Sequence, residues 1–252
     1  MLKRLQRVVA NAIARMQALE FETLLALALI SGGAFAFLRL TDEVLEGETH
    51  GFDDVILSAL RQPADLSIPI GPTWLTHAVN DITSLGGITV LALMSALVLI
   101  YLSICRRWQI AAFVTISVFG GWLLSTFLKL GVARPRPDIV PHLIEVHDLS
   151  FPSGHAMLSA VTYLTLGALL SRTQKDRSTR LFMMAAAIFL TLIIGMSRIY
   201  LGVHYPTDVL GGWCAGATWA CLCWIVARNY LPSTAKAAPV EAQVGNSVED
   251  RS

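Results

Sequence analysis

The sequence predicts an all-α, polytopic membrane protein with six transmembrane helices, and three observations support this prediction. Hydrophobic residues make up 54% of the chain and charged residues only 15%, whereas charged residues approach a quarter of an ordinary soluble domain. Six apolar runs approach the roughly 20 residues that a spanning helix needs. Lysine and arginine fall mainly in alternate connections, as expected for loops on one membrane face. The apolar runs are 21–38, 86–104, 110–128, 156–170, 181–196 and 209–227.

Residues 1–20 predict a short amphipathic helix that lies on the cytoplasmic membrane surface. Apolar residues recur at helical spacing from Leu2 to Met16, and basic residues lie between them. This pattern is typical of helices in the membrane interface. A signal peptide is not favoured, because the following apolar run shows no clear small-residue cleavage site. A frayed terminal segment is the alternative.

The fourth and fifth apolar runs, 156–170 and 181–196, are short for spanning helices. Both reach spanning length if each helix continues into the polar residues beside it. These polar residues are then expected at one membrane face. The whole of 21–230 is interpreted as one membrane domain, followed by a disordered cytoplasmic tail at 231–252.

Basic residues predict that both termini lie in the cytoplasm. With the N-terminus inside, thirteen of the 19 lysines and arginines fall on the inner side and six on the outer side. Positive charge favours cytoplasmic loops. The outer exceptions are Arg39, Arg61, Lys129, Arg134, Arg136 and Arg198. A site near these residues would face the periplasm or the extracellular space, in a bacterial inner membrane.

The outer connection 41–85 is acidic at its start and then shows helical apolar spacing. We expect two short amphipathic helices, around 55–60 and 74–82, with Trp74 as an interfacial anchor. The region is interpreted as a lid over an outer-face site. A plain linker packed on the helix bundle explains the pattern equally well.

The second outer connection, 131–154, contains four prolines, which stop a helix from continuing. His142, Glu145, His147 and Asp148 are interpreted as solvated loop residues and not as metal ligands. The four cysteines show no zinc or disulfide spacing and are interpreted as small core residues. A net charge of +1 does not indicate a nucleic-acid partner.

The stretch 197–208, between two apolar runs, carries residues suited to phosphate chemistry. Asp208 lies four residues after His204 and reaches it if the chain turns helical there. An imidazole acting as nucleophile or base needs such a partner to fix its tautomer. Arg198 supplies a guanidinium, which binds phosphate oxygens in a fork, and Pro206 fits the first turn of the next helix. Taken alone, a helix cap beside a solvated loop explains the stretch too.

Two further stretches change this assessment. Lys129 to Pro137 reads K-x6-R-P, Pro152 to His155 reads P-S-G-H, and Ser197 to Asp208 reads S-R-x5-H-x3-D. These three motifs, in this order, resemble the type-2 phosphatidic acid phosphatase superfamily. That superfamily includes lipid phosphatases, isoprenyl diphosphate phosphatases, glucose-6-phosphatase and vanadium haloperoxidases. The resemblance covers the chain from Lys129 to Asp208, and the N-terminal half matches only in general character.

The resemblance implies a role for each motif residue. His204 is the nucleophile that forms a phosphohistidine, Asp208 holds its other ring nitrogen, and His155 is the general acid for the leaving oxygen. The phosphoryl oxygens are bound by Lys129, Arg136 and Arg198, by the Ser153 hydroxyl and by the Gly154 backbone N–H at a helix start. Individually, snorkelling, headgroup binding and helix capping explain these residues. Together, three cations, two histidines and a carboxylate at one membrane face indicate a functional site, because charged side chains near membrane depth are energetically costly.

The same residues imply the remaining expectations about chemistry. Fixed cations replace a metal ion in holding phosphate, so we expect no metal and no cofactor. The expected partners are membrane lipids and a lipid phosphate or diphosphate substrate, such as an isoprenyl diphosphate, phosphatidylglycerol phosphate, phosphatidic acid or a lipid A phosphate. Nucleic acid is not expected, and the oligomeric state stays open. A lipid phosphotransferase would use the same residues, and haloperoxidase chemistry the same anion site. A transporter or flippase would show paired interrupted helices near the midplane.

Overall fold

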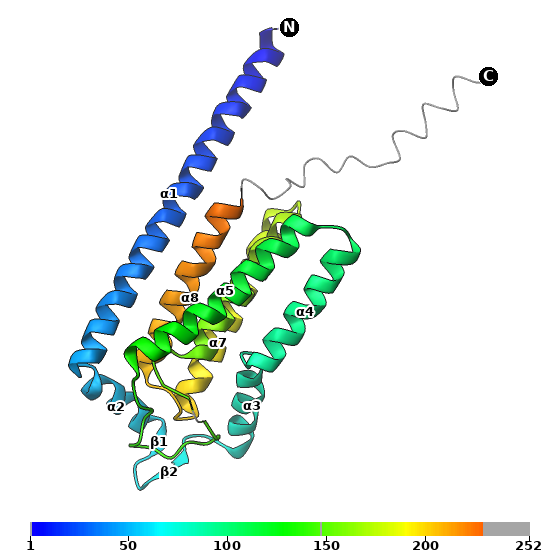
Figure 1. The fold of residues 1–252 in the computed structure, drawn as a ribbon. Coiled ribbons are helices and arrows are strands. Elements are labelled where there is room, and N and C mark those ends of the chain that lie inside the picture. The colour runs from blue at the N-terminus through cyan, green and yellow to red at the C-terminus, as the bar shows by residue number, and fades with distance from the viewer. Residues whose placement is uncertain (1, 147, 229–252) are drawn as a thin grey trace.

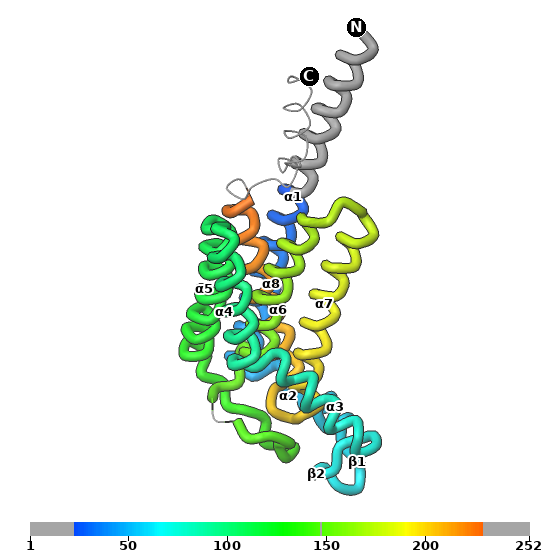
Figure 2. The backbone as a smooth tube through the Cα atoms, turned by 90° about the vertical axis from the view of Figure 1, so that its right-hand side faces the viewer, coloured from blue at the N-terminus to red at the C-terminus, as the bar shows by residue number. Residues whose placement is uncertain are grey.

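The structure, a computed structural model, describes residues 2–146 and 148–228, with side chains from residue 23 onward. Long helices lie side by side, and a small subdomain of short elements covers one end of them (Figures 1 and 2). The elements are α1 Leu2–Glu46, α2 His50–Ala59, β1 Arg61–Gln62, β2 Asp65–Pro69, α3 Thr73–Ser84, α4 Ile88–Ile104, α5 Trp108–Val132, α6 Gly154–Thr173, α7 Arg177–Tyr200 and α8 Pro206–Ala227. The predicted tail at 231–252 lies outside the described residues.

Five helices in the described part of the chain are long and apolar enough to cross a membrane. They are α5, α6, α7, α8 and the part of α1 from Thr23 to Glu46. Helices α3 and α4 form a pair bent by 45° that passes the same test together and supplies a sixth span. The prediction of an all-α polytopic membrane protein is confirmed, and its six spans are reached when this bent pair counts as one.

The helix bounds follow the sequence patterns closely near the motifs. Helix α6 begins at Gly154 and α7 continues to Tyr200, so both extend into the neighbouring polar residues as predicted. Helix α8 begins at Pro206. Helix α1 runs without a break to Glu46, so the first outer connection starts later than the predicted residue 41. How residues 1–20 lie relative to a membrane stays a prediction.

Helix α6 is central to the bundle and packs against α5, α7 and α8. Its approach to α8 depends on small residues, as is common between membrane helices. A Cβ atom at Gly216 would lie only 2.6 Å from the Met157 carbonyl oxygen, and one at Gly212 only 2.7 Å from that of Ser153. The two backbones are therefore in direct contact, which holds the start of α6 against the start of α8.

The region between α1 and α4 contains the two predicted helices, α2 and α3, and a hairpin that the sequence analysis missed. Strands β1 and β2 pair antiparallel over only a few residues, too few to give a recognisable alternating pattern. Leu57 of α2 is fully buried in a cluster with Val140, Ile199, Tyr205 and Val209. Helix α2 is therefore packed on the bundle. Among the cysteines, Cys223 is buried but Cys105 is exposed, so the interpretation of Cys105 as a core residue is wrong.

Candidate active site at the helix ends

The residues of the three motifs meet at one end of the bundle. Helices α5 and α7 end there, and α6 and α8 begin there. His155 at the start of α6 interacts electrostatically with Arg198, His204, Asp148 and Lys129. Four helix ends and the connection between α5 and α6 thus contribute polar side chains to one site.

His204 lies in the turn between α7 and α8, and only 1% of its surface is exposed. Its Nδ1 atom is 3.4 Å from Oδ2 of Asp208, and its Nε2 atom is 3.2 Å from Nη1 of Arg136. Because a guanidinium only donates hydrogen bonds, Nε2 must be the acceptor, and the ring proton then sits on Nδ1 facing Asp208. Burial, together with the neighbouring cations, holds the pKa of His204 well below its ordinary value of 6.5. The imidazole is therefore neutral at neutral pH.

Helix geometry fixes the orientation of Asp208. This residue is the third of α8, and its Oδ2 accepts the backbone N–H of Tyr205, the residue that caps the helix, at 2.9 Å. The backbone N–H of Asp208 in turn donates to the Tyr205 carbonyl at 3.0 Å, and the Asp208 carboxylate satisfies an N–H group that has no partner inside the helix. The carboxylate is fully buried and therefore has a defined direction toward His204.

Ser150 is a site residue that the sequence analysis did not identify. It is completely buried, and its hydroxyl donates to Oδ2 of Asp208 at 2.5 Å and lies 3.4 Å from Nδ1 of His204. Its backbone N–H donates to the carbonyl of Arg134 at 2.9 Å. No motif indicated it, because a serine in a proline-rich connection is common and its contacts depend on tertiary structure.

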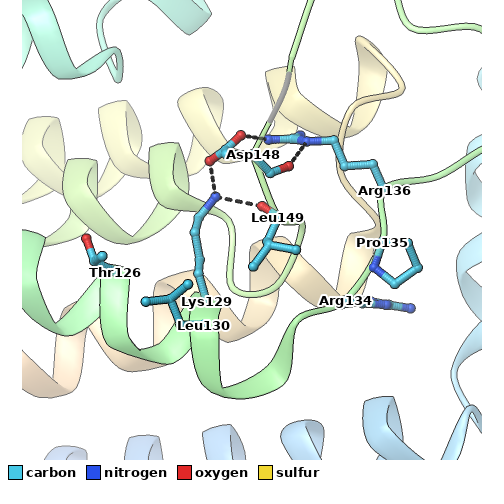
Figure 3. Close-up of a pocket in the computed structure, with 8 residues that line it drawn as sticks. All are labelled: Thr126, Lys129, Leu130, Arg134, Pro135, Arg136, Asp148 and Leu149. Carbon is cyan, nitrogen blue, oxygen red and sulfur yellow. Dashed lines mark hydrogen bonds and ion pairs between the residues drawn. The ribbon is translucent and has the colours of Figure 1, made fainter.

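Lys129 and Arg136 both form ion pairs with the carboxylate of Asp148 (Figure 3). Arg136 also donates from Nε to the Asp148 carbonyl at 2.7 Å and from Nη1 to the Val203 carbonyl at 2.5 Å. Burial alone would raise the pKa of Asp148, but Lys129 and Arg136 lower it well below the ordinary value. Asp148 is a 63% exposed loop residue, as interpreted, but its pairing with two motif cations was not predicted. His147 lies outside the described residues.

A cavity of about 450 Å³ opens beside these charges. It is lined by Thr126, Lys129, Leu130, Arg134, Pro135, Arg136, Asp148 and Leu149. On its α5 side, the Leu130 side chain is 66% exposed and belongs to a predicted membrane span. The lining of the cavity therefore combines charged side chains with exposed apolar ones.

Arg198 is the third cation and is almost completely buried, with 2% exposure. Its Nη1 donates to Thr83 Oγ1 of α3 at 3.1 Å, and its Nε has no hydrogen-bond partner among the described residues. A buried charged donor without a partner is costly. Arg198 thus has hydrogen-bonding capacity left for an anion.

Ser153 and Gly154 form the start of α6. Ser153 caps the helix, because its Oγ accepts the backbone N–H of Ala156 at 3.5 Å. Its own N–H donates to the carbonyl of Asp208 at 2.9 Å, which ties the α6 and α8 starts together. A Cβ atom at Gly154 would lie 3.6 Å from Cε of Lys129. A larger side chain there would thus fill the space beside the ammonium group.

The described residues contain no group of three or more His, Cys, Asp or Glu side chains arranged to hold a metal ion. His142, one of the histidines in the α5–α6 connection, instead has its Nε2 atom 2.7 Å from the Pro137 carbonyl.

Comparisons with known proteins agree with this architecture. The sequence profile of the PAP2 superfamily matches residues 109–231. The chain is 31% identical to phosphatidylglycerophosphatase B of Bacillus subtilis over 71% of its own length and 85% of the relative's. It is 33% identical to lipid A 1-phosphatase of Rhizobium etli over 47% of its own length and half of that relative's. The chain belongs to the PAP2 superfamily.

A solved structure shows the same fold. The crystal structure of a transmembrane PAP2-type phosphatidylglycerolphosphate phosphatase from Bacillus subtilis superposes with a TM-score of 0.71 and 26% identity, covering 80% of this chain and 97% of that chain. The expectation of an integral membrane enzyme of the phosphatase class is therefore confirmed at the level of the family.

Proposed function

We propose that the protein hydrolyses a lipid phosphate at the outer face of the bacterial cytoplasmic membrane, without a metal ion, through a phosphohistidine on His204. The observation that carries the proposal is the buried, neutral imidazole with Asp208 behind Nδ1 and Arg136 beside Nε2. A nucleophile needs a free lone pair directed at the phosphorus and a partner that stabilises its developing positive charge. Asp208 is that partner, and the Nε2 lone pair, which accepts from Arg136 in this structure, becomes free when Arg136 turns its N–H groups to the phosphoryl oxygens.

The reaction proceeds in two steps. Nε2 of His204 forms a bond to phosphorus, the bond to the lipid oxygen breaks, and His155 gives its proton to that leaving oxygen. Water then attacks the phosphohistidine, gives a proton back to His155, and inorganic phosphate leaves with His204 restored. General acid help of this kind contributes about 10²- to 10⁴-fold.

Three cations hold the transferred group. Lys129, Arg136 and Arg198 lie close enough to interact electrostatically with one another or with Asp148. Positive charges preorganised around the equatorial oxygens stabilise the transition state. The Ser153 hydroxyl and the Gly154 backbone N–H add donors at the start of α6, where the helix dipole favours an anion. The metal independence that we propose follows from this set of fixed charges.

The substrate that we propose is an amphiphilic phosphomonoester, with phosphatidylglycerol phosphate as the first candidate. The Bacillus subtilis relative that bears this activity in its name matches over 85% of its length. The exposed Leu130 at the cavity edge supports lateral access for an acyl chain from the outer leaflet. An isoprenyl diphosphate is the alternative substrate, and transfer to a second lipid is the alternative reaction.

Phosphate release by the purified protein from a panel of lipid monophosphates and diphosphates tests the proposal. We expect phosphatidylglycerol phosphate to be hydrolysed in the presence of a strong chelator and the activity to be blocked by vanadate, which mimics the five-coordinate transition state. Loss of activity on chelation, with recovery on adding Mg²⁺, would contradict the metal-free mechanism. Accumulation of a phosphorylated acceptor lipid without free phosphate would identify a transferase.

A further inference from the structure

Arg134 lies between two motif cations in the sequence, but its side chain points away from Asp148 (Figure 3). Its Nη1 donates to Oδ1 of Asp208 at 2.6 Å, and its Nη2 donates to Oδ2 of Asp53 at 2.8 Å. Both carboxylates are fully buried and the arginine is 6% exposed. We call these three residues the buried ion triad. Burying such charges costs free energy unless every partner is well placed. This cost indicates that the triad has a function.

Asp53 has a second set of contacts, which joins α2 to α8. Its Oδ1 accepts the backbone N–H of Thr207 at 3.0 Å, and its Oδ2 accepts the Thr207 hydroxyl at 2.6 Å. Thr207 is the second residue of α8, where backbone N–H groups have no partner within the helix. A carboxylate from another helix thus caps α8, and its charge suits the positive end of the helix dipole.

The triad also fixes the direction of the Asp208 carboxylate. Oδ1 is held by Arg134, while Oδ2 faces His204 and accepts from Ser150 and Tyr205. Rotation of the carboxylate would break contacts on both sides. The aromatic ring of Tyr205 covers the guanidinium, with Cζ of Arg134 4.0 Å from the ring centroid, which adds a cation–π contact.

We propose that Arg134 and Asp53 are positioning residues for the His204–Asp208 pair, and that Asp53 makes α2 a fixed part of the active site and not a movable lid. The inference rests on the proposed function in treating His204 as the reacting group. Arg134 acts on His204 through Asp208, and Asp53 offsets part of the charge of Arg134.

This arrangement predicts opposite electrostatic effects for the two residues. Removing the cation in Arg134→Gln favours protonation of His204, whereas removing the anion in Asp53→Asn disfavours it. The groups that face His204 directly stay unchanged in both variants. They are Asp208 on α8, Arg136 and Asp148 in the connection before α6, Arg198 on α7, Lys129 on α5 and His155 on α6.

Nitrogen-15 NMR titration of histidine-labelled protein in detergent measures this effect directly, with the His204 signal assigned through its loss in His204→Gln. We expect the midpoint of His204 to rise by about one pH unit in Arg134→Gln and not to rise in Asp53→Asn. No change in the first variant, or a rise in the second, overturns the inference. Because the titration needs no turnover, it tests the positioning role of Arg134 and Asp53 even if lipid hydrolysis is not detected.

Arg134→Gln leaves two buried carboxylates without their cation and can fail to fold. The double variant Asp53→Asn with Arg134→Gln removes one charge of each sign, and its His204 midpoint is expected between those of wild type and Arg134→Gln. Its kcat should still fall about 10- to 100-fold, the range seen when the hydrogen-bond partners of metal ligands are removed, with KM within about threefold. A wild-type kcat in the double variant would show that the triad does not position Asp208.

Arg39 offers a matched control for both measurements. It pairs with Asp42 and Glu43 at 3.8 and 3.6 Å, but its side chain is 58% exposed. Arg39→Gln therefore removes an arginine with two carboxylate partners at an exposed position far along the sequence from the motifs. We expect it to change neither the His204 midpoint nor kcat, and equal effects of both arginines would contradict a specific role for Arg134.

Discussion

Asp148 is the side chain whose replacement tests the electrostatics of the site most simply. Its carboxylate pairs with Lys129 and Arg136, the two cations that we propose for the phosphoryl oxygens. A phosphate group must compete with this carboxylate for the same donors. Asp148→Asn keeps the size of the side chain but removes its charge, so we expect oxyanions to bind more tightly to the variant.

The geometry sets the size of this effect. Asp148 is 63% exposed, while Lys129 and Arg136 are 14% and 10% exposed, so solvent screens each pair substantially. Ion pairs of this kind contribute about 0.2 to 1 kcal/mol each, and the two together about 0.5 to 2 kcal/mol. Since about 1.4 kcal/mol corresponds to tenfold in an equilibrium constant, the inhibition constant for vanadate should fall about 2- to 30-fold.

The assay compares vanadate and phosphate inhibition of lipid phosphate hydrolysis by wild type and Asp148→Asn. Lys129 and Arg136 hold the pKa of Asp148 far below its ordinary range despite partial burial, so it is ionised throughout pH 5 to 8 and the ratio should stay constant there. Asp138, exposed in the same connection and in no ion pair with another described residue, provides the control variant Asp138→Asn. Weaker inhibition of Asp148→Asn would refute competition and would show that Asp148 holds the cations in their working positions.

Three further predictions follow from the site and the topology. An activated nitrophenyl phosphate, whose leaving group needs little protonation, should rescue much of the lost turnover in His155→Ala and none in His204→Ala. Equal rescue of both variants would mean that the roles of nucleophile and general acid are assigned wrongly. The folded-state pKa of His204 lies well below 6.5, so its contribution to stability is complete above pH 6.5 and is lost as pH falls below 6.5 toward the folded-state pKa, by up to about 1.4 kcal/mol per pH unit. Thermal unfolding from pH 7.5 to 5 should show a steeper loss of stability in wild type than in His204→Gln, and parallel curves would count against it. In a background without native cysteines, Glu145→Cys should react with an impermeant thiol reagent in intact cells and Asp176→Cys should not, and the reverse pattern would overturn the proposed orientation.

The sequence predicted the spanning helices because their signal is local. Runs of apolar residues of bilayer length require no knowledge of tertiary structure, and α6, α7 and α8 begin or end at the polar residues expected. The motif residues Lys129, His155 and His204 were found because three short patterns occurred in a fixed order. All of these signals can be read along the chain.

The supporting contacts could not be predicted because they join distant parts of the chain. Asp53 and Thr207 are 154 positions apart and Arg134 and Asp208 are 74 apart. Asp53 stood in an acidic stretch, where a buried carboxylate looks like any solvated one. The pairing of the exposed Asp148 with Lys129 and Arg136 was missed because it too depends on how the connection folds. Ser150 depends on a backbone pairing with Arg134 that only the folded connection provides.

In the proposed mechanism, His204 carries the phosphoryl group during turnover. Rapid-quench trapping with a radiolabelled lipid phosphate, at alkaline pH where phosphohistidine survives, tests it most directly. We predict one acid-labile, base-stable label per active protein that maps to a peptide containing His204 and is absent in His204→Ala. Label that persists in His204→Ala, or turnover by His204→Ala at the wild-type rate, would contradict the account.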